Sequence, residues 1–145
     1  MGIRVGHVAF FVGPHAQGAP DDLETVIVDF IDGAQKRLGI SVQELESETI
    51  ARAIIATRQR KVLVKPVIEQ SYQKRSPPQR RHLDPRDKNE PNRAVHDAIL
   101  HSDIDIKVDY NTNIFHQKFM VWDRTAVLTG STILHPLEPI RISTM

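Results

Sequence analysis

Two kinds of hydrophobic spacing alternate along this chain, and together they predict a series of strands and helices. Short apolar runs with the length and β-branched content of strands occupy residues 5–12, 40–45, 62–69 and 104–108. Apolar residues recur at helical spacing in three further segments, residues 23–31, 50–58 and 92–102. The alternation of the two patterns favours an α/β fold, in which helices pack against a mixed sheet.

Individual residues refine these elements. The first strand, residues 5–12, is almost continuously apolar, so we expect it to be buried. Pro66 lies inside the third strand and lacks an N–H for the strand ladder, which suggests a sheet edge or a bulge. Ser47 precedes the second helix and has the hydroxyl that a helix N-cap uses.

The last apolar segment predicts a β-hairpin. Residues 115–122 form its first strand, residues 123–125 its turn and residues 126–129 its returning strand. Successive side chains point to opposite faces of a strand. His116 and Lys118 therefore share one face of the hairpin.

This hairpin gathers groups that suit a phosphate. Its turn places residues 130–132 opposite His116 and Lys118. Ser131 supplies a hydroxyl, and Gly130 lets a ligand approach the backbone closely. An imidazole, an ammonium and a hydroxyl on one surface match an anionic tetrahedral group.

Between the third strand and the third helix the composition changes. Residues 70–91 contain four prolines and almost no apolar side chains, and six Lys or Arg lie between positions 74 and 88. We expect a mobile basic loop here, inserted into a single domain of residues 1–145. Contact with a polyphosphate backbone and a merely solvated loop are equally good interpretations of its charges.

Net charge, cysteine content and the length of apolar runs limit the partners and the cellular compartments to be considered. The formal net charge is only +1, so a surface that binds nucleic acid or a membrane would have to form by local clustering of basic side chains. Cysteine is absent, which removes disulfides and thiolate chemistry and fits a reducing compartment. No apolar run approaches the ~18 residues of a membrane span. We predict a cytoplasmic protein, with secretion or a periplasmic location left open.

The spacing His116-x-Lys118-x4-Asp123-x6-Gly130-Ser131 resembles the HKD signature of the phospholipase D superfamily. The order of the predicted elements is also similar to one repeat of that fold. Two-repeat enzymes of the superfamily carry two HKD motifs, whereas this chain carries one. The resemblance therefore implies a homodimer, in which two motifs meet across a two-fold axis.

By this resemblance His116, Lys118 and Asp123 are the catalytic residues. His116 is the expected nucleophile and forms a covalent phosphohistidine, while the histidine of a second copy protonates the leaving group. Lys118 and Ser131 are expected to bind the substrate phosphate. Asp123 points away from the face of His116, so we expect it to hold the turn. The family's reaction requires no metal or other cofactor, and the other histidines lack metal-ligand spacing.

The resemblance weakens after Ser131. The family commonly has a phosphate-contacting asparagine two residues later, where this chain has Ile133, and the following residues differ from the family's continuation. We therefore expect a C-terminally truncated member. Its predicted function is that of a phosphodiesterase, specifically a metal-independent nuclease acting through a phosphohistidine. The alternatives are a phospholipid headgroup hydrolase or transferase, and a catalytically impaired member that binds phosphate or nucleic acid.

Overall fold

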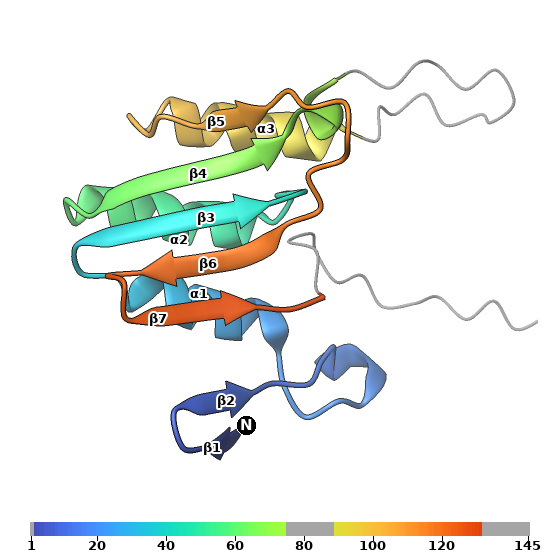
Figure 1. Cartoon of the computed structure of the whole chain (residues 1–145), viewed down its shortest axis with the longest axis vertical. Helices are drawn as coiled ribbons and strands as arrows, with labels where there is room; N and C mark the ends of the chain where they lie inside the picture. Colours follow the sequence, from blue (N-terminus) through green and yellow to red (C-terminus); the bar gives the residue numbers. More distant parts are fainter. Residues whose placement is uncertain (1, 75–88, 132–145) are drawn as a thin grey trace, which may run out of the picture.

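The computed structural model describes residues 2–74 and 89–131, which are built around a five-stranded mixed sheet (Figure 1). Its strands are β3 (Arg37–Val42), β4 (Leu63–Glu69), β5 (Lys107–Asp109), β6 (Lys118–Trp122) and β7 (Ala126–Thr129). Their order across the sheet is β5-β4-β3-β6-β7. β3, β4 and β5 run parallel, whereas β6 is antiparallel to both of its neighbours, β3 and β7.

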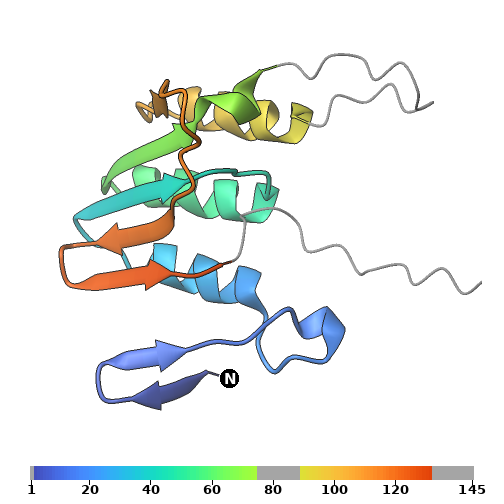
Figure 2. The ribbon, with the colours of Figure 1, turned by 45° about the vertical axis from the view of Figure 1, so that its right-hand side comes forward.

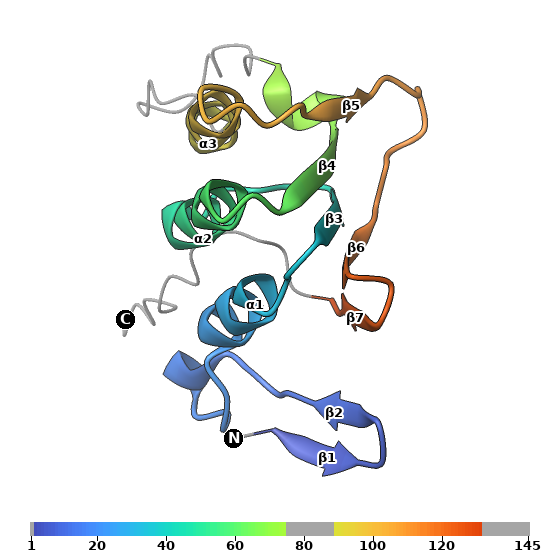
Figure 3. The same cartoon turned by 90° about the vertical axis from the view of Figure 1, so that its left-hand side faces the viewer.

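Within these residues, three α-helices pack on one face of the sheet (Figure 3). They are α1 (Leu23–Asp32), α2 (Glu48–Gln59) and α3 (Glu90–Leu100). Two short 3₁₀ turns are also present, η1 (His15–Gln17) and η2 (Gln70–Gln73). The predicted α/β fold with a mixed sheet and flanking helices is confirmed. In the part of the chain that is described, no helix is long and apolar enough to cross a membrane.

The hydrophobic core lies between the sheet and this helix layer. Ile31, Ile54 and Ile99, one from each helix, are 0% exposed. Leu38 and Ile40 of β3 point toward them and are also buried. Removing a side chain of this size from water contributes roughly 1.5–3 kcal/mol. The contact between helices and sheet is therefore the main source of stability for the scaffold that holds the loops.

The first predicted strand is wrong in both form and burial. Residues 5–12 are not one buried strand, because β1 (Ile3–Val5) and β2 (Val8–Phe10) form a separate antiparallel hairpin (Figure 2). Gly6 has a φ of 58°, a left-handed conformation that favours glycine and lets the chain reverse. Val8 and Phe10 are 52% and 56% exposed. An apolar run predicts extended structure, but it does not specify which element covers it.

Several strand boundaries also differ from the prediction. β3 occupies 37–42 and not 40–45, and β5 begins at Lys107 and not at 104. β6 begins at Lys118, so His116 lies in the segment that leads into the strand. Pro66 is in an interior strand, but β5 pairs only with residues 67–69 of β4. Pro66 therefore occupies the part of β4 that has only β3 paired with it among the described strands.

The predicted basic loop at residues 70–91 falls mostly on residues 75–88, which lie outside the described residues. Its described ends are η2 and the first turn of α3.

Asn92 ties α3 to the loop between β3 and α2. Its side chain is 2% exposed. The Asn92 Oδ1 accepts a hydrogen bond from the Leu45 N–H at 2.9 Å, and its Nδ2 donates to Glu46 Oε1 at 2.6 Å. A buried amide is costly unless it is hydrogen-bonded. Both ends of this amide are used, which fixes the loop at the carboxyl end of β3.

We expect Asn92→Ala to lower the free energy of unfolding by about 1–3 kcal/mol, because it leaves the buried Leu45 N–H without its acceptor. Chemical denaturation followed by circular dichroism measures this change. Asn113→Ala, at an exposed position, is the matched control and should change stability by less than about 0.5 kcal/mol. Equal effects of the two substitutions would contradict the role of Asn92.

Candidate active site

The candidate site lies where three strand ends meet. β3 and β6 are antiparallel and pair Val42 with Lys118, so the carboxyl end of β3 meets the amino end of β6. β7 pairs with the other edge of β6 and also ends here, just before Gly130 and Ser131. Residues far apart in the sequence therefore converge on one corner of the sheet.

His116 and Lys118 are in direct contact. The Lys118 Nζ lies 2.7 Å from the His116 Nε2. A lysine ammonium has only N–H donors, so the Nε2 must be the acceptor and the ring proton belongs on Nδ1. An Nε2 in this state has the lone pair that a nucleophile needs, and the hydrogen bond from Lys118 has to leave it before it can attack. His116 is exposed and Lys118 is half-buried.

Gln43 gives Lys118 a second partner. The Gln43 Oε1 accepts a hydrogen bond from the Lys118 Nζ at 3.2 Å. The Gln43 backbone N–H also donates to the carbonyl of Gln117 at 2.9 Å, one position beyond the end of β3. Its side-chain Nε2 donates to the hydroxyl of Tyr72 at 2.6 Å.

Glu69, the last residue of β4, anchors the segment that carries His116. Its side chain is 1% exposed. The Glu69 Oε2 accepts the Phe115 N–H at 2.6 Å, and its Oε1 accepts both the N–H and the hydroxyl of Ser71. Burial alone raises the pKa of this carboxyl, but the hydrogen bonds from Ser71 and Phe115 and the charge of Lys74 outweigh it, so the pKa is lowered. Glu69 is therefore held as a carboxylate directly beneath the loop.

Glu69, Gln43 and Tyr72 were not among the site residues identified from the sequence. A carboxylate at the end of an apolar strand was the available signal for Glu69. Gln43 and Tyr72 offered none, because polar residues after a strand are common in loops.

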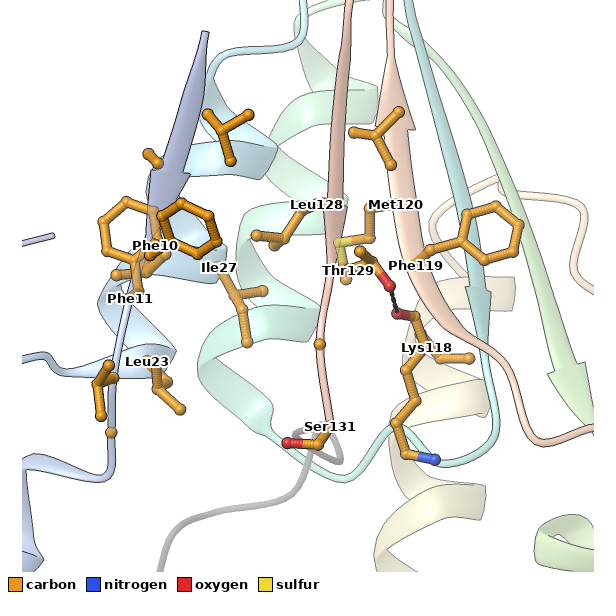
Figure 4. A pocket seen from close by; sticks show the side chains of 18 of the residues that line it. Phe10, Phe11, Leu23, Ile27, Lys118, Phe119, Met120, Leu128, Thr129 and Ser131 are labelled. Atoms are coloured by element: carbon orange, nitrogen blue, oxygen red, sulfur yellow. Dashed lines mark hydrogen bonds between the residues drawn. The ribbon is translucent and has the colours of Figure 1, made fainter. Parts of the chain in front are cut away.

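Ser131 and Lys118 both line a pocket of about 510 Å³. Figure 4 shows both side chains at the same end of this pocket, with Phe10, Phe11 and Leu23 across from them. The hydroxyl of Thr129 donates to the Lys118 carbonyl at 3.1 Å and holds the two strands together there. Lys118 thus links His116 to an apolar pocket. Thr132 and Ile133 lie outside the described residues.

Asp123 lies at the opposite end of β6 from Lys118. Its carboxylate accepts the backbone N–H groups of Gln35 at 3.0 Å, Lys36 at 2.8 Å and Arg37 at 2.7 Å. Asp123 and Arg124 have φ of 52° and 62°, so both central residues of the turn are left-handed. The structure therefore brings His116, Lys118 and Ser131 to one end of the hairpin and leaves Asp123 at the other.

Hydrogen bonding sets the charge of Asp123. The Arg37 N–H lowers the pKa of this carboxyl most, burial opposes it, and the N–H groups of Gln35 and Lys36 lower it further.

In the described residues, 2–74 and 89–131, no three His, Cys, Asp or Glu side chains are grouped as metal ligands would be.

Known proteins resemble this chain in family and in fold. A family model described as cardiolipin synthase, PLD-like domain, matches residues 27–134. The crystal structure of a phospholipase D family member, Nuc from Salmonella typhimurium, is 23% identical with a TM-score of 0.64, over 83% of this chain and 68% of that one. NucT from Helicobacter pylori is 22% identical with a TM-score of 0.56, over 86% of this chain and 72% of that one. No curated protein sequence matches the chain.

We expect Asp123→Ala to lower the melting temperature, because three backbone N–H groups lose their acceptor. A group whose pKa is lowered on folding stabilises the protein above its unfolded pKa, and this contribution disappears as pH falls. The difference in melting temperature between wild type and variant should therefore be full at neutral pH and shrink below the ordinary value of 3.8. Calorimetry at pH 7 and at successively lower pH values measures it.

Asp105→Ala, at an exposed position, is the control and should leave the melting temperature nearly unchanged. A stability difference for Asp123→Ala that grows as the pH falls would contradict the assigned role.

Proposed function

Because the chain belongs to the phospholipase D superfamily, we propose that it is a phosphodiesterase that cleaves nucleic acid without a metal ion, through a covalent phosphohistidine. The observation that carries the proposal is the 2.7 Å contact between the Lys118 Nζ and the His116 Nε2. It places an unprotonated ring nitrogen, the candidate nucleophile, beside a positive charge that can transfer its hydrogen bond to a phosphoryl oxygen when that nitrogen attacks.

The reaction proceeds in two displacements. In the first, the His116 Nε2 attacks phosphorus, and the bond from phosphorus to the leaving oxygen breaks. The leaving oxygen takes a proton from His116 of a second copy of the chain, which has to enter this step as an imidazolium and leaves it as a neutral imidazole. That histidine then removes a proton from water, the water oxygen attacks phosphorus, and the bond to His116 breaks. Dividing the reaction in this way replaces one difficult step by two easier ones.

The remaining motif residues have supporting roles in this proposal. Lys118 neutralises a phosphoryl oxygen in the ground state and the charge that develops in the transition state. Ser131 donates a hydrogen bond to the same group, since it borders the pocket together with Lys118. Asp123 holds the hairpin turn that sets the position of β6.

The choice of nucleic acid rests on the sequence. The HKD spacing and the six basic residues from position 74 to position 88 favour a polyphosphate substrate. Of these basic residues, only Lys74 is among the described ones.

A second candidate, hydrolysis or transfer at a phospholipid headgroup, is favoured by one specific observation. The pocket beside Lys118 is walled by apolar side chains of the β2 segment and α1, among them Phe10, Phe11 and Leu23. A pocket of about 510 Å³ with such walls suits an acyl chain attached to a phosphate.

The test compares substrates in the presence of EDTA. Wild-type protein should cleave single- or double-stranded DNA, and His116→Ala should lower the rate by at least about 10⁴-fold while leaving DNA binding nearly intact. Lys118→Ala should lower kcat by about 10²- to 10³-fold and also weaken substrate binding, because the lysine charge acts in both the ground state and the transition state. Acid-quench labelling with ³²P substrate should trap a phosphoprotein in wild type and not in His116→Ala.

His7→Ala, at an exposed position in the β1–β2 turn, is the matched control and should retain full activity. Hydrolysis of phosphatidylglycerol vesicles without DNA cleavage would replace the first candidate by the second. Binding of DNA that survives His116→Ala, with no turnover in wild type, would identify a catalytically impaired binding protein.

One motif supplies one histidine, whereas the two-step reaction requires two at the same phosphorus. We therefore expect a homodimer whose interface includes the surface around His116. Multi-angle light scattering at micromolar concentration should give twice the mass of one chain. A monomer under conditions in which the protein is active would contradict this assembly.

A further inference from the structure

We propose that Gln43 and Tyr72 are positioning residues that fix the ammonium of Lys118 beside His116, where it can bind the substrate phosphate. The inference rests on the proposed function for its catalytic consequence, but its structural part can be tested separately. It starts from an unbroken series of side-chain contacts: His116 to Lys118 at 2.7 Å, Lys118 to Gln43 at 3.2 Å and Gln43 to Tyr72 at 2.6 Å.

The chemistry of the groups fixes the direction of every bond in this series. Lys118 can only donate, so it must face the carbonyl oxygen of the Gln43 amide, and the amide nitrogen must then face Tyr72. The Tyr72 oxygen accepts that bond, which leaves its own proton to donate. Each group in the series therefore has one possible orientation.

Glu44 ends the series with a negative charge. Burial raises the pKa of Tyr72, the hydrogen bond to Glu44 and the charge of that carboxylate raise it further, and the hydrogen bond from Gln43 opposes them without reversing the shift. The phenol thus keeps its proton at neutral pH and remains a donor to Glu44. Bonds that point in one direction polarise one another, so the carboxylate strengthens the Gln43 oxygen as an acceptor for Lys118.

The surrounding structure holds both residues in place. The Gln43 side chain is 6% exposed, and the loop that follows it is bonded to Asn92 at Leu45. Tyr72 lies in η2, whose N-cap is the buried Glu69. The carboxylate that anchors the His116 segment is therefore also the one that starts the turn carrying Tyr72.

These contacts restrict the orientation of the flexible lysine side chain. Its ammonium sits on a flexible four-carbon stem, so one contact leaves it many orientations. Two of its three N–H bonds are directed to His116 and Gln43. The third is then directed to a phosphoryl oxygen of the substrate, and the Lys118 N–H that bonds to the His116 Nε2 has to leave that nitrogen before its lone pair attacks phosphorus. Loss of the Gln43 side chain should leave the Lys118 charge present but no longer oriented toward the substrate phosphate.

The experiment uses Gln43→Leu and Tyr72→Phe in the full chain, with bis(p-nitrophenyl) phosphate as substrate. We expect Gln43→Leu to lower kcat by about 10- to 100-fold and Tyr72→Phe by about 3- to 10-fold, with a smaller rise in KM. In a Lys118→Ala background the effect of Gln43→Leu should largely vanish, because both substitutions act through the same ammonium. An undiminished effect in that background would overturn the proposal. Gln59→Leu and Tyr110→Phe, both at exposed positions, are the matched controls.

A second measurement does not depend on activity. Long-range ¹H–¹⁵N spectra of wild type should show His116 protonated on Nδ1 and unprotonated on Nε2, and Gln43→Leu should shift these signals toward a mixture of tautomers. Unchanged His116 signals in folded Gln43→Leu would overturn the inference whether or not the enzyme is active. The expected shift, in a wild type that turns over no phosphodiester, would overturn the proposed function alone.

Discussion

The antiparallel pairing of β3 with β6 is the contact on which the rest of this structure depends. It joins Val42 to Lys118 across 76 positions of the chain and continues one step further, from the Gln43 N–H to the Gln117 carbonyl. Without this pairing, Lys118 has neither Gln43 as a partner nor a fixed relation to the strand ends around it. The other end of the β3–β6 pair is equally fixed, because the Asp123 carboxylate accepts the backbone N–H groups of residues 35–37, where β3 begins.

The residues that match the HKD spacing in the sequence are therefore divided between the two ends of one strand. His116 and Lys118 meet at the amino end of β6, and Asp123 organises the turn at its carboxyl end. A strand advances about 3.3 Å per residue, so five positions place the carboxylate well beyond hydrogen-bonding reach of the lysine. The fixed spacing between these residues is a requirement of the hairpin as much as of the chemistry. Changes at Asp123 are therefore expected to act on the site through the position of β6.

Buried polar residues around the site explain how short loops keep a defined geometry. Glu69, Asn92 and Gln43 are each at least nine-tenths buried. The side chains of Glu69 and Asn92 accept hydrogen bonds from backbone N–H groups of loops near the site, and that of Gln43 bonds to Lys118 and Tyr72. Such groups are costly in the core unless every bond is made, so they restrict the loops to few arrangements. The site thus has a rigid polar support on one side and an apolar pocket on the other.

The sequence by itself determined the β6–β7 hairpin, the α/β class and the Ser47 cap, whose hydroxyl accepts the Ile50 N–H at the start of α2, because these follow from local spacing. Only the tertiary structure decided that residues 3–10 form an exposed hairpin beside the sheet and that β6 begins at Lys118. The same holds for Glu69, Gln43 and Tyr72, which reach the site from separate strand ends and loops. Spacing along a chain specifies which face a side chain takes, whereas contacts between distant segments arise only when the sheet assembles.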